Sequence, residues 1–216
     1  MFGLIAVSNR LLCREGPDGF IPRIEKIAAS GIDALILREK DLVPGEYEAL
    51  ARDVSALCAG RCVRFIPHTF INAAFSTGSR CLHLPWDGFR SVLSDPAGGS
   101  VLKKQGLSFG VSVHSVEEAL KAQEQGASWV IAGHVFATDC KQGLDPRGPE
   151  FLAGVCRAVR VPVYAIGGVS EHTISAAAKT GAAGACIMSS LMQSPDPAAV
   201  VAELRSRLGT RERAAL

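Results

Sequence analysis

The stretch that decides the fold reads VPVYAIGGVSEHTISAAAKTGAAGACIMSS and covers residues 161–190. Two short apolar runs, at residues 161–166 and 185–188, flank a segment of helical character at residues 170–180. A strand, a helix and a second strand in this order form the βαβ unit of a parallel sheet. Gly181 marks the return to the second strand, because glycine adopts the left-handed dihedral angles that end a helix. The stretch therefore predicts two neighbouring parallel strands.

The same unit recurs along the chain. Strands are expected at residues 3–7, 34–37, 63–67, 81–84, 107–113, 129–132, 161–166 and 185–188. Helices are expected at residues 19–30, 45–59, 70–77, 87–104, 115–126, 149–159, 170–180 and 195–209. Eight βα units close most naturally as an α/β fold of the (β/α)8 TIM-barrel type, so we predict a single TIM-barrel domain over residues 1–216. A doubly wound open sheet is the alternative, but no GxGxxG motif follows the first strand.

Two helix starts carry capping signals. Ser115 and Glu118 have the spacing of a capping box, and Ser170 is placed to cap the helix after the seventh strand. These signals support the strand and helix register given above.

Composition narrows the classes of function. With 48% hydrophobic and 20% charged residues, the chain can bury a large aliphatic core. A net charge of +2, without Lys and Arg runs interleaved with aromatic residues, argues against nucleic-acid binding. The start lacks a basic leader, and no apolar run approaches the roughly 18 residues that span a bilayer. We therefore expect a cytoplasmic protein that binds a small molecule and no membrane, and the sequence leaves open whether it forms a homodimer.

Seven cysteines occur without a CxxC pair, and most are expected to fill the core. Cys58 and Cys62 could share a helix face as metal ligands, but no second Cys/His pair at ligand spacing follows them. We predict no zinc site.

Small residues follow the last two strands of the quoted stretch. Gly167–Gly168 lets backbone amides approach an anion, and Ser189–Ser190 would open a short helix whose N–H groups favour phosphate. Gly-Gly alone would indicate only a turn, but phosphate sites after strands seven and eight recur in these barrels. We therefore predict that Gly167, Gly168, Ser189 and Ser190 bind a phosphate group.

Polar side chains also follow the other predicted strands, at the end where β/α barrels build active sites. Four of the five histidines lie there, namely His68, His83, His114 and His134. One such histidine is more often structural, but four indicate a pocket, in which we expect two to be hydrogen-bonded wall residues.

Arg38 and Lys40 alternate along the end of the second strand, so both side chains can point the same way while Glu39 points elsewhere. A guanidinium fork and an ammonium point charge suit a second anionic group on the ligand. A solvated basic strand end is the alternative interpretation.

The segment GHVFATDCKQGLDPRG at residues 133–148 has no helical period and is typical of an active-site lid, a disordered connector being the alternative. His134 at its root is the best general acid/base candidate, because imidazole titrates near neutral pH. The predicted lid and pocket residues are Phe136, Thr138, Cys140, Lys141 and His68.

The assembled segments resemble the thiamine phosphate synthase superfamily from the first strand to the last helix. GVSVHSVEEA, YAIGGV and CIMSS are common to its branches. After strand six the synthases read roughly GPxFPTxTK, whereas this chain reads GHVFATDCKQG, which is similar to the thiazole tautomerase (TenI-like) branch.

The resemblance to that branch implies a thiamine-biosynthesis isomerase that needs neither cofactor nor metal. A carboxylated thiazole phosphate tautomer would be converted to its aromatic form by a proton shift, in which one histidine, matching His134, serves as base and acid. Gly168 and Ser189–Ser190 would hold the phosphate, Arg38 or Lys40 would hold the carboxylate, and His114 would add a hydrogen bond.

The synthases also use Asn-Asp after strand three and GQxD after strand four to hold magnesium against a pyrophosphate. This chain reads His68–Thr69 at the first position and HLPWD, ending in Asp87, at the second. One carboxylate rarely holds magnesium without substrate phosphates. The sequence therefore argues against synthase activity, the joining of a pyrimidine pyrophosphate to a thiazole phosphate, and leaves it as the first alternative.

Two further alternatives remain. A regulatory protein could keep the phosphate site without turnover, although no DNA-reading helix is visible. An enzyme for other phosphorylated heterocycles could use Trp86, Phe136 and Cys140 to reshape the pocket.

Overall fold

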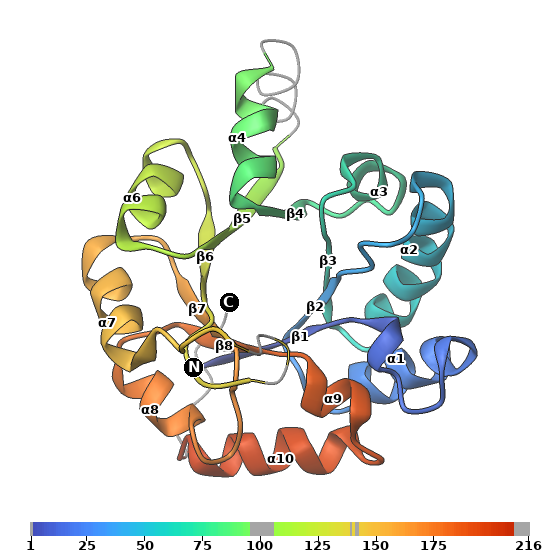
Figure 1. Ribbon diagram of the computed structural model, residues 1–216. Coiled ribbons are helices and arrows are strands. Elements are labelled where there is room, and N and C mark those ends of the chain that lie inside the picture. Colours follow the sequence, from blue (N-terminus) through green and yellow to red (C-terminus); the bar gives the residue numbers. More distant parts are fainter. Residues whose placement is uncertain (1, 96–105, 139, 141–142, 210–216) are drawn as a thin grey trace.

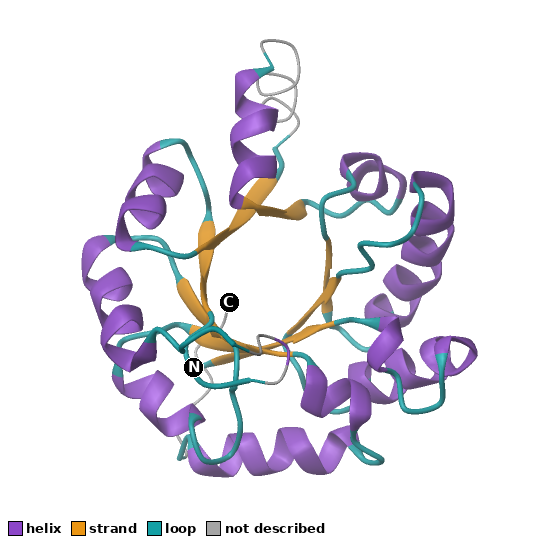
Figure 2. Cartoon of the chain, viewed as in Figure 1, coloured by secondary structure: helices purple, strands orange, loops and turns teal. Residues whose placement is uncertain are grey.

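Eight parallel strands form a nearly closed barrel, and helices alternate with them around its outside (Figure 1). Figure 2 shows the same view with helices and strands in different colours. The computed structural model describes residues 2–95, 106–138, 140 and 143–209. The predicted α/β TIM barrel is confirmed. A doubly wound open sheet is excluded because the first strand pairs with both the second and the eighth, so that Ile5 lies between Ala34 and Cys186.

The strands follow the predicted register closely. They are β1 Gly3–Val7, β2 Ala34–Leu37, β3 Arg64–Pro67, β4 Cys81–Pro85, β5 Ser108–Val113, β6 Trp129–Gly133, β7 Val163–Ile166 and β8 Gly184–Ile187. Their order in the sheet is β3-β2-β1-β8-β7-β6-β5-β4.

The described helices cover the outside of this sheet. They are α1 Phe20–Ala28, α2 Pro44–Ala59, α3 Ile71–Ser76, α4 Trp86–Ser94, α6 Val116–Glu124, α7 Gly148–Ala158, α8 Ile174–Lys179, α9 Ser189–Gln193 and α10 Pro197–Arg207, with short 3-10 turns η1 Arg10–Leu12 and η2 Pro17–Gly19. None of the helices within these described ranges has the length and apolar character needed to cross a membrane.

Two helix boundaries differ from the sequence prediction, and two short turns were not predicted. The helix expected at residues 87–104 corresponds to α4, which ends at Ser94 because the backbone of Asp95 is extended; residues 96–104 of that prediction lie outside the described residues. The helix expected from residue 170 begins at Ile174, because Ser170 and Thr173 first form a turn in which Ser170 N donates to Thr173 Oγ1 at 2.9 Å. The turns η1 and η2 were not predicted, since three residues are too few to show a helical period.

Strand side chains alternate between two parts of the core, as the two-residue period of a strand requires. In β1, Leu4 and Ala6 pack outward beneath the helices. Ile5 and Val7 point inward, where they meet Ile36 and other lumen residues. The lumen is thus filled by side chains, and what remains for function lies at its two ends.

Strands β3 and β4 lie at the two ends of the sheet order and share no extended pairing. These strands meet at an isolated bridge between His68 and His83, where Thr69 N donates to His83 O at 2.9 Å. Both histidines therefore sit at the closure of the barrel, near its carboxyl end.

Candidate active site at the carboxyl ends of the strands

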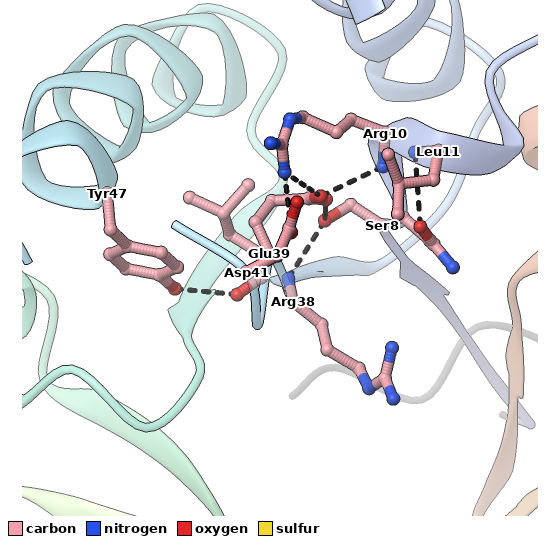
Figure 3. A network of polar contacts seen from close by, with 9 residues as sticks. Ser8, Arg10, Leu11, Arg38, Glu39, Asp41 and Tyr47 are labelled. Atoms are coloured by element: carbon pink, nitrogen blue, oxygen red, sulfur yellow. Dashed lines mark hydrogen bonds and ion pairs between the residues drawn. The ribbon is translucent and has the colours of Figure 1, made fainter. Parts of the chain in front are cut away.

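A buried carboxylate ties the ends of β1 and β2 together (Figure 3). Glu39 accepts hydrogen bonds from Ser8 Oγ at 2.6 Å and from Arg10 N at 2.9 Å. Burial raises the pKa of Glu39, and these hydrogen bonds oppose the rise. The Arg10 guanidinium in turn pairs with Asp41 at 2.6 Å. Glu39 is therefore fully engaged in joining two strand ends.

This network also places Arg38. Its backbone N donates to Ser8 Oγ at 2.8 Å, so the carboxylate of Glu39 orients Arg38 through one serine. The Arg38 guanidinium points away from the network in Figure 3 and forms no ion pair with the described part of the chain. Burial lowers the pKa of Arg38, and Glu39 and Cys140 oppose that shift. A half-buried guanidinium of this kind is a natural partner for an anionic ligand.

His68 and His83 form a neutral wall beside Arg38. Their ring centroids lie 5.6 Å apart, and each ring has a hydroxyl partner at 2.8 Å, Thr69 Oγ1 for His68 Nδ1 and Ser112 Oγ for His83 Nε2. Burial, strengthened by nearby positive groups, lowers the pKa of His68 to about 2 and that of His83 to about 3. Both rings are therefore uncharged at neutral pH and cannot serve there as proton carriers through an imidazolium form.

The Gly167–Gly168 turn is needed for close packing at the end of β7. A Cβ on Gly167 would lie 2.4 Å from His134 Cβ, and one on Gly168 would lie 2.2 Å from Ala137 O. Both glycines also have positive φ, at 95° and 63°. The turn thus allows the segment after β6 to lie against β7, where Phe136 N donates to Gly167 O at 3.0 Å.

Ser189 and Ser190 open the short helix α9 directly after β8. The first helical donors are Leu191 N and Met192 N, which both bind Met188 O. Because β7 and β8 are neighbours, paired at Ile166 and Cys186, the glycine turn and the serine pair follow adjacent strands at one end of the barrel.

The predicted lid residues lie along one segment between β6 and α7. Phe136 and Thr138 are half-buried and Cys140 is exposed, while Lys141 lies outside the described residues. Cys140 is near enough to Arg38 to influence its pKa, which places this part of the segment toward β2.

His134 and His114 are both held by backbone oxygens. His134 Nε2 lies 3.3 Å from Leu144 O within the same segment, and His114 Nδ1 lies 2.9 Å from Gly133 O. Because a carbonyl oxygen only accepts, the ring nitrogen that faces it carries a proton in each histidine.

The predicted capping box after β5 is confirmed with a shift of one residue. Ser115 Oγ accepts from Glu118 N at 3.0 Å, and Glu118 Oε2 accepts from His114 N at 2.6 Å rather than from the cap residue. The two bonds fix the backbone at His114.

Sequence reasoning missed three residues that position the site. Ser8 and Ser112 bind Glu39 and His83, and Tyr47 Oη donates to Leu37 O at 2.6 Å while accepting from His68 N at 2.8 Å. The sequence could have indicated Tyr47, because it is a lone tyrosine on an otherwise aliphatic helix face. Nothing in the sequence pattern indicates a role for Ser8 or Ser112.

The carboxyl ends of the strands form the mouth of the barrel, which carries the half-buried guanidinium of Arg38 after β2, the Gly167–Gly168 turn after β7 and Ser189–Ser190 after β8. TIM-barrel enzymes build their active sites at this end. Residues 4–191 match the thiamine monophosphate synthase family (TMP-TENI), so the chain belongs to this family.

Individual relatives agree with this assignment. The chain is 32% identical over 183 residues to the thiamine-phosphate synthase of Methanoregula boonei, covering 84% of this chain and 82% of the relative. It is 28% identical over 193 residues to thiamine-phosphate synthase 2 of Streptococcus pneumoniae TIGR4, covering 89% of each. Among solved structures, thiamine phosphate pyrophosphorylase from Pyrococcus furiosus superposes with a TM-score of 0.79 at 25% identity, covering 96% of this chain and 95% of that one.

These comparisons correct the functional prediction. The tautomerase interpretation, with His134 as base and acid, is wrong as the leading function, because relatives along nearly the whole chain are named synthases. The expectation that synthase activity is absent is contradicted by the same relatives. The prediction failed because it gave the single segment GHVFATDCKQG more weight than the similarity of the whole barrel.

The magnesium site that the family resemblance implies does not fit the residues at this mouth. Thr69 and the buried, neutral His68 follow β3, and Asp87 is exposed in the first turn of α4. Magnesium requires oxygen ligands in octahedral geometry. Across the described ranges, no three His, Cys, Asp or Glu side chains cluster in a way that could hold a metal ion. Within the described residues, the side chains at this mouth therefore offer no complete magnesium site.

Proposed function

We propose that this chain joins a thiazole phosphate to a pyrimidine that carries a pyrophosphate, the reaction of a thiamine-phosphate synthase. The observation that carries the proposal is the family match over residues 4–191, together with named synthases of which the chain covers 82–89%. In this reaction the thiazole displaces pyrophosphate from the pyrimidine partner. The protein must therefore hold one phosphate and neutralise a departing pyrophosphate.

The thiazole phosphate is assigned to the ends of β7 and β8. Gly167 and Gly168 form the turn after β7, where neither has a side chain and the segment after β6 packs closely against them. Ser189 and Ser190 add hydroxyl groups from the adjacent strand end. Backbone N–H groups and hydroxyls bind phosphate without a net positive charge. The ends of β7 and β8 therefore hold the thiazole phosphate, which stays on the product.

The pyrophosphate is assigned to Arg38 and Lys40 after β2, which β1 separates from β8 in the sheet. Ser8 and Glu39 hold the backbone of Arg38 in place, and its half-buried guanidinium extends away from them, where its fork of donors can make a bidentate contact with phosphate oxygens. His68 beside it stays neutral, so it can hydrogen-bond without changing the charge of the site. This placement separates the two anionic groups and orients the reacting atoms between them.

The test is product formation from thiazole phosphate and pyrimidine pyrophosphate in a buffer with magnesium, followed by chromatography of thiamine phosphate. We expect turnover by the wild type and a loss in kcat/KM of about 10- to 100-fold for Arg38→Ala, since a charge-assisted hydrogen-bonded pair contributes about 1.5–3 kcal/mol. Arg52→Ala, which removes the same charge from the exposed face of α2, is the matched control and should stay within about twofold.

A folded wild-type protein that forms no thiamine phosphate would overturn the proposed reaction. Equal losses in Arg38→Ala and Arg52→Ala would instead overturn the assignment of the pyrophosphate to Arg38.

A further inference from the structure

A cavity lies at the end of the barrel opposite the candidate active site. It has a volume of about 710 Å³ and is lined by residues at the amino ends of the strands. Arg64, Cys81 and Trp129 are the first residues of β3, β4 and β6, and Tyr164 lies near the start of β7. Since the candidate active site is built at the carboxyl ends, this cavity is a separate site, and its size is typical of pockets for small molecules.

The cavity carries a positive charge without a matching negative one. Arg64 is exposed and forms no ion pair with the residues that the structure describes. The acidic residue in the lining, Asp33, is already engaged. Its carboxylate accepts from Leu4 N at 2.7 Å and pairs with Arg205 at 2.7 Å. The remaining charge in the cavity therefore favours an anionic ligand.

Two aromatic side chains, Trp129 and Tyr164, line the cavity. Trp129 Nε1 is buried and has no hydrogen-bond partner in the described chain. The indole lies over Gly110, where a Cβ would come within 2.0 Å of it. Burial raises the pKa of Tyr164, so its phenol keeps its proton. The aromatic surfaces of Trp129 and Tyr164, together with the Tyr164 hydroxyl, suit a flat ligand that carries an acceptor atom.

The remaining polar groups do not suit a cation. Burial raises the pKa of Cys81, so its thiol stays protonated and is a poor metal ligand. Arg64 would repel a metal ion at the same place.

We propose that this cavity binds a small aromatic carboxylate. The carboxylate lies on the Arg64 guanidinium, which offers a fork of donors that matches it. The aromatic ring lies against Trp129 and Tyr164 within the apolar part of the cavity, where it buries its flat surface. This inference is independent of the reaction proposed for the other end of the barrel.

The test uses 4-hydroxybenzoate as the probe and 4-hydroxybenzamide as its uncharged match. The chain has two tryptophans, so Trp86→Phe leaves Trp129 as the one reporter of fluorescence. We expect 4-hydroxybenzoate to change this fluorescence saturably and calorimetry to give the same Kd. The amide should bind at least about tenfold more weakly, the ratio that corresponds to about 1.4 kcal/mol.

Two arginine variants locate the ligand. Arg64→Gln should weaken 4-hydroxybenzoate binding at least about tenfold, while Arg80→Gln, an exposed arginine outside the cavity lining, should change it less than about twofold. Melting temperatures of both variants confirm that they fold.

Three results would overturn the proposal. They are the absence of saturable binding up to millimolar probe, equal binding of the acid and the amide, and a loss in Arg38→Ala in place of Arg64→Gln. The last result would put the probe at the carboxyl end of the barrel.

Discussion

The buried histidines His68 and His83 should make the barrel sensitive to acid. Burial holds their pKa values at about 2 and about 3 in the folded protein, against about 6.5 in an unfolded chain. Because the folded values are the lower ones, only the unfolded chain takes up protons between these limits. The stability that the neutral rings contribute is therefore complete above pH 6.5 and is lost as the pH falls toward 3.

The size of the effect follows from this difference. Each histidine contributes a slope of about 1.4 kcal/mol per pH unit below pH 6.5, because one extra proton binds to the unfolded state. At pH 5 the loss is about 2 kcal/mol for each ring and about 4 kcal/mol for both. Since both folded values lie well below 5, the result does not depend on their exact size. A loss of this size is a large part of the 5–15 kcal/mol that usually stabilises a domain.

Urea unfolding at pH 7.5 and at pH 5 measures this loss. In His68→Asn and in His83→Asn, the fall in unfolding free energy between the two pH values should be smaller than in the wild type by about 2 kcal/mol. His172→Asn is the matched control, because the His172 side chain is 81% exposed and its removal should leave the fall unchanged. If the double variant of His68 and His83 lost as much stability as the wild type, the reasoning would be refuted.

Three further substitutions test the packing around the site by thermal or urea unfolding. Glu39→Ala leaves the donors of Ser8 and Arg10 without an acceptor and should lower the unfolding free energy by about 3 kcal/mol. Asp41→Ala removes an exposed carboxylate and should lower it by less than about 1 kcal/mol. Equal losses in the two variants would contradict the role of Glu39. Gly168→Ala forces a Cβ against Ala137 O at positive φ and should cost about 3 kcal/mol, and a neutral result would show that the loop has room to move. Tyr47→Phe removes a hydroxyl that both donates and accepts, and should cost about 2 kcal/mol; no change in unfolding free energy would argue against that bridge.

The strand pattern was predictable because each strand is a short apolar run closed by a turn residue. All eight strands lie within a few residues of the predicted runs, and the barrel follows from their number and parallel direction. The helix boundaries were less predictable where side chains form turns of their own, as at Ser170 and Thr173. Local hydrogen bonds of this kind compete with the first helical turn and leave no periodic signal.

The site was predictable at the level of strand ends and not at the level of contacts. Arg38 and His68 follow their strands as expected, and the structure brings them together with His83. Their protonation states depend on burial between β3 and β4, which requires the closed barrel and cannot be deduced from spacing. The Gly167–Gly168 turn likewise has a packing role against His134 that only the fold reveals.

The misassigned function has a physical origin as well. Thr69 stands where the synthases have a metal ligand, and His134 stands where they have proline. Considered alone, these two positions indicate a reaction other than that of a synthase. The similarity to synthases carries more information than these positions do, because it extends over nearly the whole barrel.

The most direct test of the proposed reaction is the rate of pyrophosphate release by the wild-type chain, measured with both substrates together and with each alone. We predict release only when thiazole phosphate and pyrimidine pyrophosphate are both present, in equal amount to the thiamine phosphate formed. Release that does not depend on thiazole phosphate, or no release by folded protein, would contradict the proposal.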